Sequence, residues 1–319
     1  MPSASNREKR DGPGNKLRYK IKNVCQLIIF VVILLVSIPS NAAEPLVDPG
    51  WVKAHLGAPG VVFLDARGGR AYRAGHIPGA VHADYDQGWR TTKAGVPGML
   101  PPTAYLEAKI GGLGIGNADH VVIAAGGYSA PELAIATRIY WTFKVLGHDA
   151  VSILDGGMGA YFADKGNRVE KTTAAPGAKT FKANLRHELI ATAADVKALG
   201  QGGLIDSRSQ GQFDGIIQSP AAARPGTIPG AGNLPITALT VNNGGVFRGI
   251  EAIRDLYKMA GVPTGGETIN FCNTGHLASL GWFVSHQLLG NDKARMYDGS
   301  MAEWTRNPAN PVEAKGRGN

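Results

Sequence analysis

The stretch VVFLDARGGRAYRAGHIPGA, residues 61–80, joins a short apolar run to an Asp-x-Arg triplet and a Gly-x-Ile-Pro-Gly-Ala turn. A related pattern returns in GLIDSRSQGQFDG (203–215) and RPGTIPGAGN (224–233). A second pair of segments has the same relationship, since FKVLGHDAVSILDGGMGAY (143–161) returns as HQLLGNDKARMYDGSMAEW (286–304). Similarity within one chain at a nearly constant spacing indicates a duplicated unit. We therefore predict two copies of one fold.

Each copy alternates short apolar runs with segments of helical character. In the second copy, ETINF (267–271) is predicted to be a buried strand, and HLASLGWFVSHQLL (276–289) has helical spacing and ends before Gly290. Such alternation is typical of α/β units around a mostly parallel sheet. The sequence predicts an α/β fold with two similar domains, each a mostly parallel sheet flanked by helices.

Domain boundaries follow from the two copies and from local composition. The predicted parts are a signal at 1–43, a first domain at 44–169, a linker at 170–186, a second domain at 187–307 and a tail at 308–319. The linker is rich in Lys, Ala and Thr and has a Pro-Gly break, as expected of a surface segment. The tail is polar, and we expect it to be loosely held.

The front of the chain has the features of an export signal. Residues 1–26 hold seven basic and two acidic residues, and the apolar run LIIFVVILLV (27–36) leads to small residues near Ala42 and Ala43. That run is about half of the roughly 20 residues that a membrane-spanning helix needs. We expect a cleaved signal and an exported, periplasmic protein. The alternative is an uncleaved N-terminal anchor that faces the periplasm, and only then would the membrane be a partner.

The net charge of +8 is concentrated in the same segment. Residues 1–26 carry five of the eight net positive charges, so three remain for residues 27–319. No dense basic stripe with interleaved aromatic residues is left, which argues against nucleic acid as a partner.

The sequence contains two cysteines, one in the predicted signal and one in the predicted second domain. Cys25 lies in the predicted signal, so the exported chain would carry Cys272 alone and no internal disulfide. Cys272 follows a predicted strand and precedes a predicted helix, where the N–H groups of the turn and the helix N-terminus favour a thiolate. A small buried core residue is the other interpretation of such a cysteine.

Together these motifs resemble the tandem-domain rhodaneses, the thiosulfate and 3-mercaptopyruvate sulfurtransferase family. The resemblance spans about residues 44–306 and includes GVPGMLPP (95–102). It implies that Cys272 takes a sulfane sulfur from a small-molecule donor such as thiosulfate, holds it as a persulfide and passes it to a thiophilic acceptor. No metal and no organic cofactor is implied. The first copy should be non-catalytic, because the positions that correspond to Cys272 by counting are Ala124, Ala125 or Ser129.

The loop after Cys272 is expected to stabilise the outer sulfur with its backbone N–H groups. The predicted persulfide cradle comprises Asn273, Thr274, Gly275, His276, Leu277 and Ala278. We interpret His276 as a residue of the rim rather than as a catalytic acid.

Charge is missing from this loop in comparison with the family. Asn273 and Thr274 stand where thiosulfate-using relatives carry cationic side chains, and Gln212 stands at a position where they carry an arginine that holds the donor. An insertion, IIQSPAAAR (216–224), brings Arg224 near the predicted rim. We expect Arg224 or Arg248 to supply the missing charge, and Gln212 is a further candidate for contact with the substrate.

Asp206 and Arg208 are predicted to support the loop rather than to act on the substrate. The equivalent Asp65 and Arg67 occur in the copy that has no cysteine, so a structural pair explains both.

Other functions of a cysteine loop fit this sequence less well. Phosphatases with such a loop carry an arginine six residues after the cysteine to bind phosphate, and this chain has Ala278 there. Cys272 and His276 would provide two metal ligands, fewer than the four of a structural zinc site. The remaining alternative is a non-catalytic sulfur carrier or partner-binding module in the exported compartment. No protein acceptor is indicated by the sequence.

Overall fold

The structure is a computed structural model that describes residues 43–173 and 175–316. The predicted export signal therefore lies outside the described residues except for Ala43. Residues Ala42–Asn319 form one compact unit. None of its described helices is both long and apolar enough to cross a membrane.

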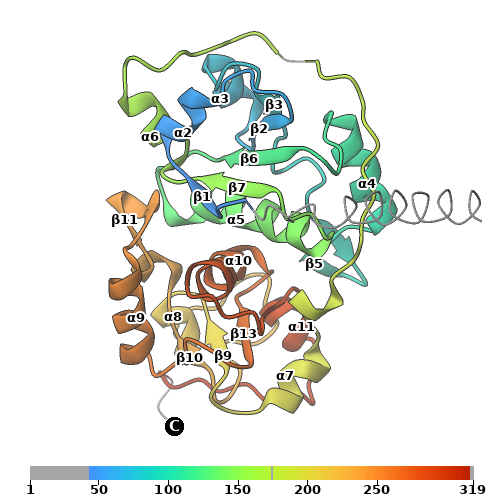
Figure 1. The fold of residues 1–319 in the computed structure, drawn as a ribbon. Coiled ribbons are helices and arrows are strands. Elements are labelled where there is room, and N and C mark those ends of the chain that lie inside the picture. The colour runs from blue at the N-terminus through green and yellow to red at the C-terminus, as the bar shows by residue number, and fades with distance from the viewer. Residues whose placement is uncertain (1–42, 174, 317–319) are drawn as a thin grey trace, which may run out of the picture. The chain divides into compact units, whose positions relative to one another are not determined.

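The described chain is built from two halves with matching elements (Figure 1). The first half contains β1 (Leu46–Val47), α2 (Pro49–Ala54), β2 (Val61–Asp65), α3 (Gly69–Ala74), β3 (Val81–His82), β4 (Thr91–Lys93), β5 (Val96–Met99), α4 (Thr103–Gly112), β6 (His120–Ala124), α5 (Ala130–Val145), β7 (Val151–Leu154) and α6 (Gly157–Ala163).

The second half repeats this order and adds short 3-10 turns and one π-helical turn. Its elements are η2 (His187–Leu189), β8 (Ile190–Ala191), α7 (Ala193–Leu199), β9 (Leu204–Asp206), α8 (Gln210–Phe213), β10 (Gly232–Asn233), η3 (Ile236–Ala238), β11 (Thr240–Val241), η4 (Asn242–Gly244), β12 (Val246–Phe247), α9 (Ile250–Met259), β13 (Thr268–Phe271), α10 (His276–Phe283), η5 (Val284–Leu288), β14 (Ala294–Tyr297) and α11 (Ser300–Trp304).

Each half has a five-stranded sheet, and the two sheets have the same strand order. The first runs β1-β7-β6-β2-β3 and the second runs β8-β14-β13-β9-β10. All strand pairs in both sheets are parallel. The predicted α/β fold with two parallel-sheet domains is therefore confirmed.

Strand register identifies the residue of the first half that corresponds to Cys272. Asp65 of β2 pairs with Ala124 of β6, and Asp206 of β9 pairs with Phe271 of β13. The next residue is Ala125 in the first half and Cys272 in the second. Of the three positions that counting suggested, the structure selects Ala125.

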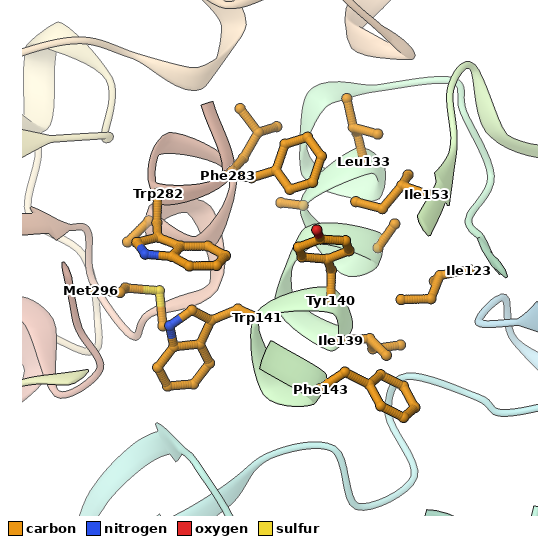
Figure 2. Packing of buried hydrophobic residues seen from close by; sticks show 14 of the residues in the cluster. Ile123, Leu133, Ile139, Tyr140, Trp141, Phe143, Ile153, Trp282, Phe283 and Met296 are labelled. Atoms are coloured by element: carbon orange, nitrogen blue, oxygen red, sulfur yellow. The ribbon is translucent and has the colours of Figure 1, made fainter. Parts of the chain in front are cut away.

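The two halves share an apolar core made by α5 and α10. The Tyr140 ring of α5 meets the Phe283 ring of α10 edge-on at 4.9 Å, and the Thr137 and Ser279 hydroxyls are 2.8 Å apart. Figure 2 shows Tyr140 and Phe283 together with Trp282 in this cluster. Each large apolar side chain that is fully buried contributes about 1.5–3 kcal/mol, so this contact holds the two halves together.

Each half has a two-stranded hairpin that is hydrogen-bonded to the other half, β4–β5 in the first half and β11–β12 in the second. The first half donates a hydrogen bond from the Leu100 N–H, just after β5, to Asp298 (2.7 Å). The second half donates one from the Phe247 N–H, in β12, to Asp155 (3.3 Å). Since Asp155 and Asp298 are equivalent residues of the repeat, each half is anchored to the end of the other half's sheet.

The helix predicted over 276–289 is present, with one refinement. The α-helix α10 ends at Phe283 and continues as the π-helical turn η5 to Leu288, in which Val284 and Ser285 are both buried and Ser285 bonds to Tyr257 (2.8 Å). The expectation of a loose tail is wrong, because the tail up to Gly316 is held. Thr227 and Glu313 exchange backbone hydrogen bonds of 2.8 and 2.9 Å, which tie the tail to the second half.

Candidate active site

Cys272 directly follows strand β13, and three residues separate it from His276, the first residue of helix α10. It is 1% exposed and its thiol is free, whereas Cys25 lies outside the described residues. Gly275 precedes α10 with φ of +70°, a left-handed conformation that suits glycine. The loop thus turns sharply, and its other members, Asn273 and Thr274, are half-buried at the surface.

Ser300 holds this loop from behind. Its Oγ accepts hydrogen bonds from the N–H groups of Cys272 (3.1 Å) and Gly275 (3.2 Å), and it donates to the Tyr297 carbonyl (2.8 Å). Ser300 has φ of +49°, which is costly for a residue with a Cβ, and the equivalent residue of the first half is Gly157. We interpret the strained backbone of Ser300 as the cost of placing its hydroxyl where it accepts hydrogen bonds from the cysteine loop.

One residue of the predicted cradle is therefore corrected. The Gly275 N–H bonds to Ser300 and is not directed at the sulfur. His276, Leu277 and Ala278 form the first turn of α10, where N–H groups lack an intrahelical acceptor. No side chain caps this helix, so these three groups can receive a bound anion.

The equivalent loop of the first half is closed by its own side chains. Ser129 Oγ accepts from the Glu132 N–H (3.3 Å), and the Glu132 carboxylate accepts from the Tyr128 N–H (2.9 Å). A carboxylate thus already occupies the start of α5, and a second anion there would be repelled. The copy with the cysteine is the one whose helix start is left open.

Arg208 and Asp206 support the loop from one side. Arg208 Nε and Nη2 lie 2.9 and 2.6 Å from the two oxygens of Asp206, and both residues are buried. Arg208 Nη1 also reaches Asn273 Oδ1 (3.4 Å). Asn273 in turn donates to Gln212 Oε1 (3.2 Å), so Gln212 lies beside the loop and contributes a neutral amide.

Arg138 supports the loop from the first half, and sequence reasoning missed it. This fully buried residue of α5 contacts Asp298 Oδ1 (2.6 Å), the Gly275 carbonyl (3.2 Å) and the Gly98 carbonyl (3.2 Å). The available signal was a charged residue in the middle of a mostly apolar helix, since Thr137 precedes Arg138 and Ile139, Tyr140 and Trp141 follow it.

His276 is bound on both ring nitrogens by the first half. Nε2 lies 3.1 Å from the Pro131 carbonyl and Nδ1 lies 2.8 Å from the Tyr85 hydroxyl. Burial, reinforced by Arg90 and Arg138, lowers the pKa of His276 to about 3, so the ring is neutral at pH 7. The carbonyl can only accept, so Nε2 carries the proton and Nδ1 accepts from Tyr85.

This arrangement gives His276 an orienting role. A ring that is already neutral and bound at both nitrogens has no proton to give to a leaving group at pH 7. Burial also raises the pKa of Tyr85, so its hydroxyl keeps the proton that it donates to His276.

The two arginines proposed as replacements for the missing charge are not placed for that purpose. Arg224 donates to the carbonyls of Thr305 (3.2 Å), Asn307 (2.9 Å) and Asn310 (2.8 Å), so it holds the C-terminal segment. Arg248 is exposed and donates to the Ala238 carbonyl (2.7 Å) at the base of its own hairpin. Neither guanidinium has a hydrogen bond to the described cysteine loop.

The described part of the chain has no candidate metal-binding site. Residues 43–173 and 175–316 contain no group of three or more His, Cys, Asp or Glu side chains that could hold an ion.

Comparison with known proteins agrees with this architecture. The family model described as a rhodanese-like domain matches residues 48–164 and 187–307. A Saccharopolyspora erythraea protein named "Putative thiosulfate sulfurtransferase" is 33% identical over 280 residues, which is 85% of this chain and 96% of that protein. A Haloferax volcanii relative of the same name is 31% identical over 288 residues, covering 85% of this chain and 97% of that protein.

Solved structures show the same fold. SseA from Escherichia coli, a 3-mercaptopyruvate sulfurtransferase, has a TM-score of 0.70 at 24% identity, covering 81% of this chain and 99% of that one. EanB in complex with ergothioneine has a TM-score of 0.73 at 22% identity, covering 85% of this chain and 70% of that one. The duplicated sheets, the cysteine at the open start of α10 and these likenesses together show that the chain belongs to the rhodanese family of sulfurtransferases.

Proposed function

We propose that the protein transfers a sulfane sulfur from a small donor such as thiosulfate to a thiophilic acceptor through a persulfide on Cys272. The observation that carries this proposal is the contrast between the two loops. Helix α10 begins without a side-chain cap beside Cys272, whereas the first half has Ala125 and a helix start closed by Glu132. An anionic outer sulfur can be held in the second half only.

The transfer has two steps that balance without a redox partner. The Cys272 thiolate attacks the outer sulfur of thiosulfate, the bond between the two donor sulfurs breaks, and sulfite leaves with the electron pair. The acceptor then attacks the outer sulfur of the persulfide, and the Cys272 thiolate leaves. With cyanide as the acceptor the product is thiocyanate.

The backbone around Cys272 suits a persulfide because its N–H donors are held in place before the reaction. The first-turn N–H groups of α10 have no other acceptor in the helix, and Ser300 fixes the loop that carries them. Donors that are fixed before the reaction stabilise developing charge without reorganisation. Neutral His276 adds no positive charge to the loop at pH 7.

Intact mass spectrometry tests the proposal. The protein is measured before and after incubation with thiosulfate or with 3-mercaptopyruvate, and again after cyanide, beside Cys272→Ser. A gain of one sulfur that cyanide removes and the variant lacks is expected. If neither donor adds sulfur to the wild-type protein, the catalytic proposal fails and a non-catalytic sulfur-carrier or partner-binding module takes its place.

We also propose that the protein acts outside the cytoplasm. The support is the basic and apolar sequence of residues 1–43. Cell fractionation followed by N-terminal sequencing tests it. A mature N-terminus near Ala43 in the periplasmic fraction is expected, and a full-length cytoplasmic protein would contradict export.

A further inference from the structure

None of the second-half side chains that are hydrogen-bonded to the described cysteine loop offers an unpaired positive charge. Asn273, Thr274 and Gln212 are neutral, and Arg208 is paired with Asp206. Two arginines of the first half remain near the loop, namely Arg138 and Arg90. Arg138 is fully buried and paired with Asp298, so it is not available to a ligand.

Arg90 differs from Arg138 in its exposure and in its charged partners. It is half-buried, it immediately precedes β4, and among the described residues no carboxylate lies within 4 Å of its guanidinium. Its Cζ lies 5.5 Å from the centre of the Tyr85 ring. The Tyr85 hydroxyl is 2.8 Å from Nδ1 of His276, the first residue of α10. Arg90 is thus one side chain removed from the open helix start beside Cys272.

The segment that carries Arg90 is rigidly held. The Tyr85 N–H bonds to the Ala66 carbonyl (3.1 Å), and Trp89 Nε1 bonds to the Ala83 carbonyl (3.1 Å) with its ring fully buried. Because both ends of the segment are fixed, the backbone of Arg90 has a defined position beside Tyr85 and needs no rearrangement when a ligand binds.

The charges of Arg90 and Cys272 both act on Tyr85, and that of Arg90 also acts on His276. The pKa of Tyr85 responds, after burial, to Arg138, Arg90 and Cys272, and the pKa of His276 responds to burial and then to Arg90. Tyr85 therefore lies in the field of both the nucleophile and the guanidinium. Tyr85 and His276 are neutral at pH 7, so neither of them offsets the charge of Arg90.

We propose that Arg90, supplied by the half without the cysteine, binds the anionic end of the sulfur donor while the donor's outer sulfur meets Cys272. This inference rests on the proposed function and names the group that recognises its substrate. A guanidinium can hold two oxygens of a sulfonate-like or carboxylate group at once. The donor class is accordingly a small anion rather than a neutral polysulfide.

The experiment compares two alkylating agents of similar size and opposite character. Iodoacetate carries a carboxylate and iodoacetamide is neutral, and alkylation of a thiol by either agent does not require sulfur transfer. The rate ratio of iodoacetate to iodoacetamide at neutral pH is measured for the wild type, Arg90→Gln, Arg90→Lys and Arg248→Gln. Arg248 is the matched control because it is an exposed arginine without a hydrogen bond to the loop.

Arg90→Gln is expected to lower this ratio by about tenfold or more, the size of one charge-assisted hydrogen bond, while the iodoacetamide rate stays near that of the wild type. Arg90→Lys should keep part of the ratio, because it retains charge but loses the two-pronged contact. Arg248→Gln should leave it unchanged. An unchanged ratio in Arg90→Gln, or an equal fall in Arg248→Gln, overturns the proposal.

A second measurement separates this inference from the sulfurtransferase proposal. The KM for thiosulfate should rise by about tenfold in Arg90→Gln, while discharge of a preformed persulfide by cyanide should keep its rate. If the wild type takes up no sulfur but the alkylation ratio still depends on Arg90, the sulfurtransferase proposal fails and the anion site remains. If sulfur uptake is normal and the ratio does not depend on Arg90, only the anion site fails.

Discussion

Arg138 of the first half and Asp298 of the second half form a buried ion pair of 2.6 Å directly behind the cysteine loop. A Cβ added at Gly275 would lie 2.6 Å from Arg138 Nη1 and 2.8 Å from Asp298 Oδ1, so the pair and the loop are in tight contact. Asp298 also accepts the Leu100 N–H (2.7 Å). The pair therefore joins the two halves at the loop that carries Cys272.

Breaking this pair should destabilise the whole compact unit. Arg138→Met leaves Asp298 buried without its cation, and we expect a loss of about 3–5 kcal/mol in the free energy of unfolding measured with urea. Arg254→Met removes an exposed pair with Glu251 (3.9 Å) and should cost less than about 1 kcal/mol. Equal losses in the two variants would contradict the role given to Arg138.

Ser300 should matter more for activity than for stability. Ser300→Gly removes the left-handed strain but also the acceptor for the Cys272 and Gly275 N–H groups. We expect the rate of persulfide formation to fall by about tenfold to a hundredfold, while the free energy of unfolding changes by about 1 kcal/mol or less. Rapid-quench mass spectrometry and urea titration measure the two effects. Full activity in Ser300→Gly would show that the hydroxyl does not organise the loop.

Gly98 should not tolerate a side chain, because the backbone of the cysteine loop lies against it. Its φ is +84°, and an added Cβ would lie 2.7 Å from the Thr274 carbonyl oxygen. Gly95 is a matched control, since its φ is +77° but its nearest contact is the flexible end of Arg306. Gly98→Ala should be less stable than Gly95→Ala by about 1–3 kcal/mol and should also lose activity. Thermal unfolding of both variants decides this, and similar melting temperatures would refute it.

Stability should fall as the pH drops below neutrality. The pKa of His276 is lowered to about 3 and that of His286 to about 4, both chiefly by burial. The unfolded chain, with histidine pKa near 6.5, binds more protons in this window, so stability is complete above about pH 6.5 and is lost as the pH falls toward 4. His276→Gln should show a smaller difference between urea unfolding at about pH 7 and about pH 5. The same difference as the wild type would contradict this assignment.

A cysteine placed at the equivalent position of the first half should not take up sulfur from thiosulfate. In Ala125→Cys combined with Cys272→Ser, the thiol would face a helix start closed by Ser129 and Glu132. We expect no stable gain of sulfur from thiosulfate by intact mass spectrometry. If this double variant forms a persulfide as fast as the wild type, the open helix start is not what selects the second half.

Much of the molecule could be predicted from local sequence pattern. The repeat around Asp65 and Asp206 predicted two equivalent parallel-sheet domains, and the strand and helix predicted on either side of Cys272 are both present. Support of the loop by Asp206 and Arg208 was predicted as well, because the equivalent Asp65 and Arg67 occur in the copy that has no cysteine. These features depend on short-range periodicity and on neighbours that the chain itself places together.

The electrostatic surroundings of the site were decided by the tertiary structure alone. Tyr85 meets His276 across 191 residues of sequence and Arg138 meets Asp298 across 160. The sequence analysis placed the missing charge on Arg224 or Arg248. The Arg224 guanidinium binds the C-terminal segment, and the Arg248 guanidinium binds the Ala238 carbonyl of its own hairpin. The physical reason is that packing of α5 against α10, together with the crossed hairpins, brings the first half onto the cysteine loop. Spacing along a chain specifies a strand or a helix, but it does not specify which distant side chain packs against it.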